Sequence, residues 1–357
     1  TGAAPVAECI RAAVAHPLPP PTGDGWLERP GGAGRTADES RVRRGVGVAA
    51  GFKNVMYSEG FEDDSEARVR LTGTGIASVT CAVAEVGQGF VTIASQIART
   101  VLGCDAVVEP ADTMGIDSAG SSSASRQTWM SGGAVLRAAR LVADQVRTAL
   151  AERLGVTPES LTLTDDGRIV AESGGDAESL DMTLAEAAGD QVFEATAVHR
   201  HRRTYPLDER GQGDADVSFV FAAHRAVVDV DTDLGLVRVV QVATGQDVGR
   251  VLHPTQVIGQ IEGGIAQGVG LAVMEEMVIE DGLVRNPSFT DYLIPTVADT
   301  PEVLATCIEE PEPDAPFGAK GAGEPPTISS TAAVAAAIRA ATGVDVTRVP
   351  VRPWDLI

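Results

Sequence analysis

The sequence has little positive charge and few cysteines. Lysine and arginine together number 28 against 50 acidic residues, and the formal net charge is −22. This charge argues against a nucleic-acid or anionic-membrane partner, because like charges repel. The four cysteines, Cys9, Cys81, Cys104 and Cys307, show no CxxC spacing, so this chain alone predicts neither a structural zinc site nor an iron–sulfur cluster. This cysteine usage is typical of a reduced, cytoplasmic protein.

The sequence also lacks a long uninterrupted apolar run. The best candidate, residues 257–273, contains Gln260, Glu262 and Gln267. Because polar and charged side chains are costly in lipid, we expect a core helix here and no membrane span. The residues after Thr1 contain neither a basic segment nor an apolar one, so we expect no signal peptide and interpret the start as a cut end.

The 357 residues are enough for two or more folding units. Expected strands and helices are interleaved without a strict βαβ alternation, which predicts an α+β or mixed α/β fold. Proline and glycine are concentrated before residue 43, which indicates a connecting segment and linker. We expect four regions: the linker at 1–42, a first subdomain at 43–155, a smaller acidic region at 156–215 and a second subdomain at 216–357.

The most informative stretch is 318–326, GAKGAGEPP, which precedes an alanine-rich run at 327–342 predicted to be helical. Proline is favoured at the first helical position, which would place Glu324 at or just before the start of that helix. The positive end of the helix dipole would then favour an ionised carboxylate. The pattern indicates a rigidly held base, and the alternative is a glutamate that only caps the helix.

A second motif joins an expected strand within 67–86 to an expected helix. Gly87, Gln88 and Gly89 form the turn, and apolar residues at helical spacing follow from Phe90. A helix start after such a turn presents free backbone N–H groups to an anion or a polar heterocycle. The alternative is a tight turn that needs its glycines for backbone geometry only.

Two loops add polar side chains. Residues 117–128, DSAGSSSASRQT, lie between an expected strand and a helix expected to start near Gly132. Their hydroxyls suit a surface that wraps a ligand rich in hydrogen-bonding groups, and the alternative is a flexible serine linker. An irregular loop at 52–61 carries Tyr57 and Ser58.

Two other features favour structural interpretations. His199 and His201 lie on one face of an expected strand, and we interpret this strand as basic and solvated, because a metal site usually needs a further ligand. The expected helix at 254–277 contains five glycines, Gly259, Gly263, Gly264, Gly268 and Gly270. Since glycine destabilises a helix, these residues predict a very close neighbour.

Three segments taken together resemble the molybdenum-binding subunit of the xanthine dehydrogenase and aldehyde oxidoreductase family. They are EVGQGFVTIASQIA at 85–98, SSSASRQTWMSGGAV at 121–135 and GAKGAGEPP at 318–326, in the order found in that family. Residues 247–271 and the ending VRPWDL support the likeness, which extends from about residue 43 to the end.

The resemblance implies a molybdenum-cofactor-binding domain with two α/β subdomains. Glu324 would be the general base, and Tyr57 and Ser58 would lie in the substrate pocket. The pterin, or its nucleotide extension, would contact Gly87, Gln88, Gly89, Ser123, Ala124, Ser125, Arg126, Gln127 and Thr128.

The implied enzyme is a molybdenum-dependent oxidoreductase. It would insert water-derived oxygen at an electron-poor C–H of an N-heterocycle, with xanthine or hypoxanthine as the first expectation and hence a role in purine metabolism, or of an aldehyde. The metal would be held by the pterin dithiolene, in plain or cytosine dinucleotide form, and not by protein side chains. A family subunit is about twice this long, so the resemblance implies a hetero-oligomer. The N-terminal half of the subunit, [2Fe–2S] clusters and FAD would lie on partner chains or missing regions.

Two alternatives stay open. The chain could be a non-catalytic half that only binds pterin or assembles a larger complex. The segment GSSSAS also resembles the serine-rich segment of amidase-type hydrolases, in which serines and a lysine form the nucleophile relay. The charged residue nearest to these serines is Arg126, and an arginine cannot act as a base.

Overall fold

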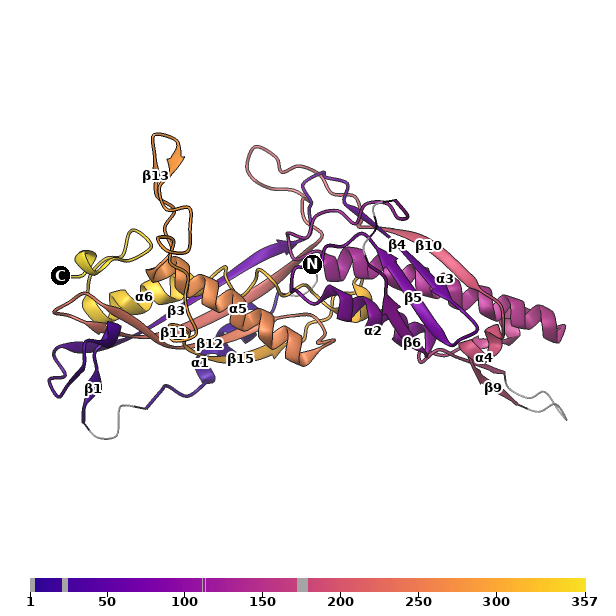
Figure 1. Ribbon diagram of the computed structural model, residues 1–357, viewed down its shortest axis with the longest axis horizontal. Coiled ribbons are helices and arrows are strands. Elements are labelled where there is room, and N and C mark those ends of the chain that lie inside the picture. Colours follow the sequence, from indigo (N-terminus) through magenta and orange to yellow (C-terminus); the bar gives the residue numbers. More distant parts are fainter. Residues whose placement is uncertain (1–3, 21–24, 111, 113, 172–178) are drawn as a thin grey trace. The chain divides into compact units, whose positions relative to one another are not determined.

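The computed structural model describes residues 4–20, 25–110, 112, 114–171 and 179–357. The chain divides into two compact units that alternate along the sequence (Figure 1). The first unit contains Thr1–Lys53, Phe219–Glu310 and Ala322–Ile357, and the second contains Asn54–Ser218 and Pro311–Gly321. Each unit combines helices with a β-sheet, which confirms the predicted α+β class.

The first unit is built on a four-stranded sheet in the order β15-β12-β11-β3. Strands β11 and β12 pair antiparallel, and β15 adds to β12 in parallel. The strands are β3 (Val42–Val55), β11 (Ser218–Asp231), β12 (Val237–Asp247) and β15 (Glu302–Ile308).

Helices α5 (Pro254–Val273) and α6 (Ser330–Thr342) bury their apolar faces against this sheet. Their core includes Ile261 and Ile338 with Val242 of β12. Helix α1 (Val6–Ala15) buries Cys9 and Ala13 beside Ala223 of β11. Burial of apolar surface of this kind is the main stabilising contribution to the unit.

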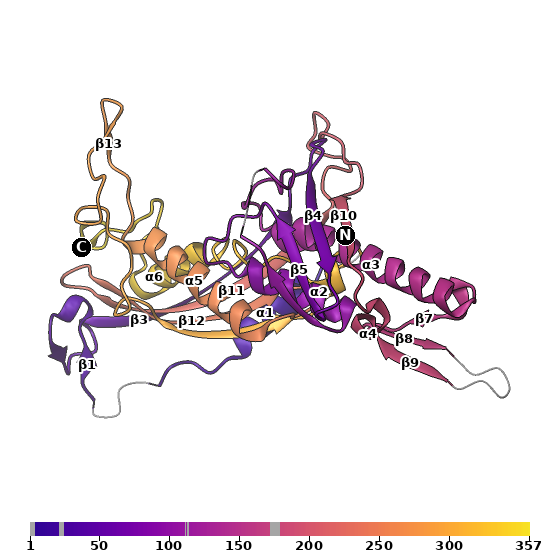
Figure 2. The ribbon, with the colours of Figure 1, turned by 45° about the vertical axis from the view of Figure 1, so that its right-hand side comes forward.

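The second unit contains a four-stranded sheet in the order β10-β4-β5-β6 (Figure 2). Helices α2 and α3 pack on it and enclose an apolar core rich in alanine and valine. The elements are β4 (Asp64–Leu71), β5 (Ile76–Cys81), α2 (Phe90–Leu102), β6 (Asp105–Val108), α3 (Gln127–Leu154) and β10 (Phe193–Arg200).

Smaller elements complete the two units. In the second unit a three-stranded sheet leads into a short helix, which Thr183 and Glu186 start with a reciprocal capping box. In the first unit two short hairpins are present. These elements are β7 (Thr162–Leu163), β8 (Arg168–Ala171), β9 (Leu180–Thr183), α4 (Leu184–Ala188), β1 (Leu27–Glu28), β2 (Arg35–Thr36), β13 (Ile279–Glu280) and β14 (Leu283–Val284).

Three predicted boundaries are wrong. Strand β3 continues to Val55, so the first residues of the loop expected at 52–61 belong to the strand. Helix α3 begins at Gln127, five residues before the predicted start near Gly132, because Trp129 and Met130 of its first turns are buried in the unit. Helix α5 ends at Val273 rather than at residue 277.

His199 is buried and not solvated, which contradicts the interpretation of its strand. Its side chain lies on β10 against Gly133 and the indole of Trp129, and only 7% of the residue is exposed. Burial lowers the pKa of His199 to about 4, so the ring is neutral near pH 7. Over the residues that the structure describes, no three His, Cys, Asp or Glu side chains are grouped to hold a metal ion.

No helix in the described ranges is both long and apolar enough to cross a membrane.

Candidate functional site

The Gly-Gln-Gly turn has the predicted position between a strand and a helix. Gly87 and Gly89 have φ angles of 99° and 86°, a conformation that residues with a β-carbon rarely adopt. Helix α2 begins directly afterwards at Phe90. The glycines are therefore required by the turn itself, whatever it binds.

The backbone N–H groups of this turn are not free, which corrects the prediction. Those of Gly87, Gly89 and Val91 donate to the carboxylate of Glu85 at 2.9, 3.0 and 3.0 Å. Partial burial alone would raise the pKa of Glu85, but these N–H groups outweigh it and the net shift is downward. An ionised side chain thus occupies the helix start, and Gln88 is the group that this turn presents.

The side chain of Gln88 connects the turn to the serine-rich loop. Its Nε2 donates to the carbonyl of Ala84 at 3.0 Å and to Oε1 of Gln127 at 2.6 Å, while its Oε1 accepts from the N–H of Val86. Gln127 in turn donates to the Ser122 hydroxyl at 2.8 Å. The structure therefore brings together two segments that the sequence placed 39 residues apart.

The serine-rich loop holds two consecutive residues in the left-handed region. Ala124 and Ser125 have φ angles of 66° and 49°, which is rare outside glycine and persists only where the surroundings impose it. The carbonyl of Ala124 accepts from the N–H of Met56 at 3.0 Å, and Met56 itself has a φ of 74°. Strained backbone of this kind is common at ligand sites and argues against a flexible linker.

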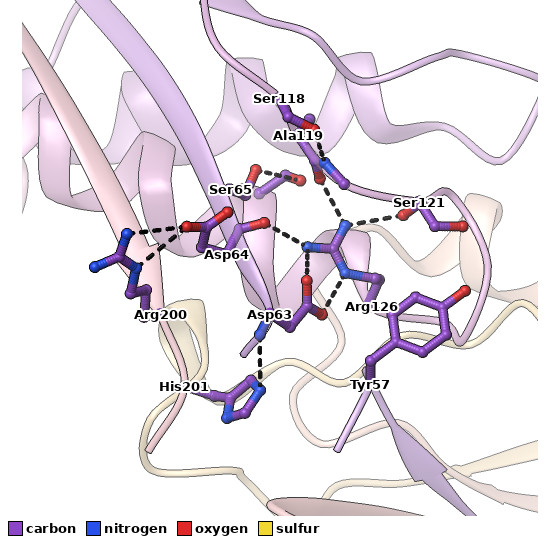
Figure 3. A network of polar contacts seen from close by, with 12 residues as sticks. Tyr57, Asp63, Asp64, Ser65, Ser118, Ala119, Ser121, Arg126, Arg200 and His201 are labelled. Atoms are coloured by element: carbon purple, nitrogen blue, oxygen red, sulfur yellow. Dashed lines mark hydrogen bonds and ion pairs between the residues drawn. The ribbon is translucent and has the colours of Figure 1, made fainter. Parts of the chain in front are cut away.

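Arg126 is fully occupied in shaping this loop (Figure 3). Its guanidinium makes a bidentate pair with Asp63 at 2.6 Å and is completely buried. The remaining N–H groups donate to the backbone carbonyls of Ala119, Ser121 and Asp64. All five donors are thus used by protein oxygens, so the side chain holds the loop and has no N–H group left for a ligand.

Tyr57 and Ser123, predicted for substrate and cofactor respectively, contact each other through their hydroxyls. Ser123 also lies 2.8 Å from the hydroxyl of Ser121, and hydrogen bonds from Ser121 and Ser123 lower the pKa of Tyr57. Ser58 is directed elsewhere, and its hydroxyl donates to Asp216 at 3.1 Å.

Gly321 of the GAKGAGEPP motif packs on the same loop. The carbonyl oxygen of Ser125 occupies the place where a β-carbon on residue 321 would lie. Close backbone approach, and not only conformational freedom, is therefore the reason for glycine at this position.

Glu324 is not at a helix start, which overturns the dipole argument. Helix α6 begins six residues later, at Ser330, and Glu324 lies in the turn before it. Instead, the carboxylate is paired with Lys53 of β3, whose Nζ lies 2.7 Å from Oε2. Lys53 was not among the residues predicted from the sequence. Its rarity was a signal, because the chain has only two lysines, Lys53 and Lys320, beside 26 arginines.

Comparison with known proteins adds to this geometry. The model of the family described as the molybdopterin cofactor-binding domain matches residues 25–301. The chain is 30% identical over 332 residues to the xanthine dehydrogenase molybdenum-binding subunit of Escherichia coli O157:H7, covering 89% of this chain and 42% of that protein. It is 32% identical over 348 residues to the 6-hydroxypseudooxynicotine dehydrogenase complex subunit gamma of Paenarthrobacter nicotinovorans, covering 93% of this chain and 41% of that protein. The chain therefore spans about two fifths of the length of these relatives.

Solved structures agree on the fold. Quinoline 2-oxidoreductase from Pseudomonas putida 86 superposes with a TM-score of 0.74 at 29% identity, over 89% of this chain and 42% of that one. The Cu,Mo-CO dehydrogenase gives a TM-score of 0.75 at 23% identity, over 89% of this chain and 41% of that one. The mixed helix and sheet architecture is thus that of the molybdenum-binding domain of these enzymes.

Proposed function

The chain belongs to the family of molybdopterin cofactor-binding domains, and we propose that it is the part of a molybdenum hydroxylase that binds the pterin of the cofactor. The observation that carries the proposal is the bond from Gln88 to Gln127, which joins the Gly-Gln-Gly turn to the serine-rich loop. Both segments were expected to bind the cofactor, and they meet within one compact unit.

The residues present fit the cofactor. The two segments offer amides and hydroxyls, the neutral donors and acceptors that a pterin edge requires. A β-carbon on Gly87 would meet no atom of the described residues within 4 Å, so this side of the turn is open. We assign contacts with the cofactor to the segments 87–89 and 123–128, in which Arg126 acts by holding the loop in shape.

Glu324 is the proposed general base. When bound, the cofactor supplies the oxygen that is inserted and takes up the electron pair from the substrate C–H bond. The carboxylate of Glu324 would accept the proton released as that oxygen becomes a nucleophile. Its ion pair with Lys53 supports the ionised form that a base needs.

An N-heterocycle is the proposed substrate class, with xanthine or hypoxanthine first and an aldehyde as the alternative. The names of the xanthine and quinoline enzymes among the similar proteins both denote substrates with a nitrogen-containing ring. Tyr57 and Ser58 would contact the substrate, and the bond between Tyr57 and Ser123 supports a place for Tyr57 beside the cofactor loop. The family match gives no support to the amidase alternative.

Partner chains are part of the proposal because the chain spans only about two fifths of its relatives. The rest of the molybdenum subunit would complete the active site. Iron–sulfur and FAD subunits would carry electrons away, as the names "dehydrogenase complex subunit gamma" and "molybdenum-binding subunit" suggest for multi-subunit relatives. The four cysteines of the chain are free thiols, so a reducing compartment such as the cytoplasm is proposed.

The test is the molybdenum and pterin content of the chain, purified from its own host together with its bound partners. We expect both in equal amounts per chain, and release of CMP on mild hydrolysis would identify the cytosine dinucleotide form. Glu324→Gln should keep both and lose turnover, whereas Glu262→Gln, the same change on the exposed face of α5, should keep turnover. A complex that contains neither molybdenum nor pterin would overturn the proposal, and a loaded complex without hydroxylase turnover would favour the non-catalytic alternative.

A further inference from the structure

The two lysines of this chain are exceptional, because arginine fills the other 26 cationic positions. One of them, Lys320, lies four residues before Glu324 in the sequence, and the other, Lys53, binds the Glu324 carboxylate. Arginine and lysine bind a carboxylate differently. The guanidinium forms a planar fork that engages both oxygens, whereas an ammonium is a compact charge that can hold a single oxygen.

The fold places Lys53 on the face of β3 that meets α6 and the turn before it. Side chains alternate along a strand, so residues 45, 47, 51 and 53 share one face. On this face Gly45 and Gly47 pack directly against the backbone of α6 at Ala337, and Gly51 contacts Ile328. Lys53 continues this row, and its side chain is only 16% exposed.

This arrangement fixes the position of the Lys53 ammonium relative to the Glu324 carboxylate. Residues 323–329 form bends and turns, so Glu324 lies outside the first turn of α6, where the helix dipole would act most strongly. The ammonium reaches Oε2 at 2.7 Å from a strand that is hydrogen-bonded into the sheet, while the Glu324 side chain is 48% exposed. A mostly buried cation thus holds one oxygen of a carboxylate that is about half exposed.

We propose that Lys53 is a positioning residue for the base of the reaction. Its ammonium holds Oε2 of Glu324, which orients the carboxylate and keeps it ionised. This inference rests on the proposed function for its catalytic meaning, but the ion pair itself can be tested without cofactor. Lys53 undergoes no proton transfer in this role, and the proton that Glu324 accepts leaves to solvent after turnover.

The first test needs no activity. The full chain is treated with formaldehyde and cyanoborohydride, and dimethylation of each lysine is followed by mass spectrometry of its peptide. Glu324→Gln removes the charged partner that holds the ammonium, so Lys53 should be more accessible to the reagent and should be modified about threefold faster or more. Glu262→Gln, on exposed α5 surface, should leave the rate at Lys53 as in the wild type. Equal rates at Lys53 in all three proteins would overturn the pairing.

The second test uses the loaded complex. Lys53→Met should lower kcat by about 10- to 100-fold, which is part of the rate enhancement that a general base contributes. The KM should stay within about threefold of the wild-type value, and the molybdenum and pterin contents should not change. Lys53→Arg keeps the charge but should recover only part of kcat, because its fork competes for both oxygens. The double variant with Glu324→Gln should be no slower than Glu324→Gln alone.

The outcomes separate the two proposals. If Lys53→Met lowers the cofactor content, or slows the Glu324→Gln enzyme by the same factor as the wild type, Lys53 has a merely structural role and the inference is wrong. If the wild-type complex holds no molybdenum, the proposed function fails, and the labelling result still decides whether the pair exists.

Discussion

Gly264 of α5 and Pro326 pack so closely that a β-carbon built on the glycine would lie 2.7 Å from the β-carbon of the proline. The same holds one turn further, where a β-carbon on Gly268 would meet the Ser330 hydroxyl. Gly270 is also closely packed, so three of the five glycines of α5 confirm the predicted close neighbour. For Gly259 and Gly263 the prediction is wrong, since no atom of the described residues lies within 4 Å of their β-carbon positions.

Adjacent glycines of α5 should therefore respond in opposite ways to the same change. Gly263→Ala adds a methyl group in open space and should raise the free energy of unfolding by about 0.5–1 kcal/mol, as alanine favours a helix. Gly264→Ala pushes against Pro326, two residues after Glu324, and should cost about 1–3 kcal/mol. Urea denaturation of the two variants measures the difference. Equal stabilities would show that α5 can shift away from the turn.

The buried pair of Arg126 and Asp63 predicts a large loss of stability. Arg126→Met leaves the carboxylate of Asp63 buried without its partner and should cost about 3–5 kcal/mol. The control is Arg11→Ala, which removes an exposed pair with Glu8 and should cost under about 0.5 kcal/mol. Both values come from urea denaturation. A cost for Arg126→Met as small as that of the control would contradict the buried network.

Stability should fall in mild acid because of His199. An unfolded histidine titrates near its ordinary pKa of about 6.5, and burial lowers the pKa of His199 to about 4. Between these values the unfolded chain binds a proton that the folded chain does not. The contribution of His199 to the free energy of unfolding should therefore fall by about 3 kcal/mol as the pH drops from about 6.5 to about 4.

The variant His199→Leu checks this assignment. Within the described part of the chain neither ring nitrogen has a hydrogen-bond partner, so the change should cost little at pH 7.5. Its stability should depend less steeply on pH. His224, whose pKa burial lowers to about 3, and carboxylates with a lowered pKa such as Glu85 contribute to the remaining slope. Denaturation at a series of pH values makes the comparison, and an unchanged slope would assign the effect to other groups.

Gln88 should control cofactor retention. Gln88→Ala removes its bonds to Ala84, Val86 and Gln127 and should lower bound molybdenum and pterin about fivefold or more. Gln145→Ala is the control, because it removes a side-chain bond on exposed α3 surface in the same unit. Metal analysis and pterin fluorescence of the purified complexes give the answer. Full cofactor content in Gln88→Ala would count against the assigned role.

Local patterns predicted most of the fold. The Gly-Gln-Gly turn, the start of α2 at Phe90 and the start of α5 at Pro254 follow from glycine and proline positions and apolar periodicity, which act over a few residues. The start of α3 was missed because its N-cap residue, Arg126, is not one of the usual capping residues, while the burial of Trp129 depends on the whole unit.

The candidate site, like the fold, was predicted only in part from the sequence. The sequence by itself determined which segments are candidates for the chemistry, because their motifs are short and contiguous, and it determined the mixed α/β architecture. Only the tertiary structure decided what those residues touch. In the structure Glu85 accepts backbone N–H groups at the start of α2, and Arg126 forms an ion pair with Asp63. His199 is buried, and Glu324 forms an ion pair with Lys53. Lys53 and Glu324 are 271 positions apart, and no local pattern encodes such a contact, because it depends on the packing of β3 against the segment that precedes α6.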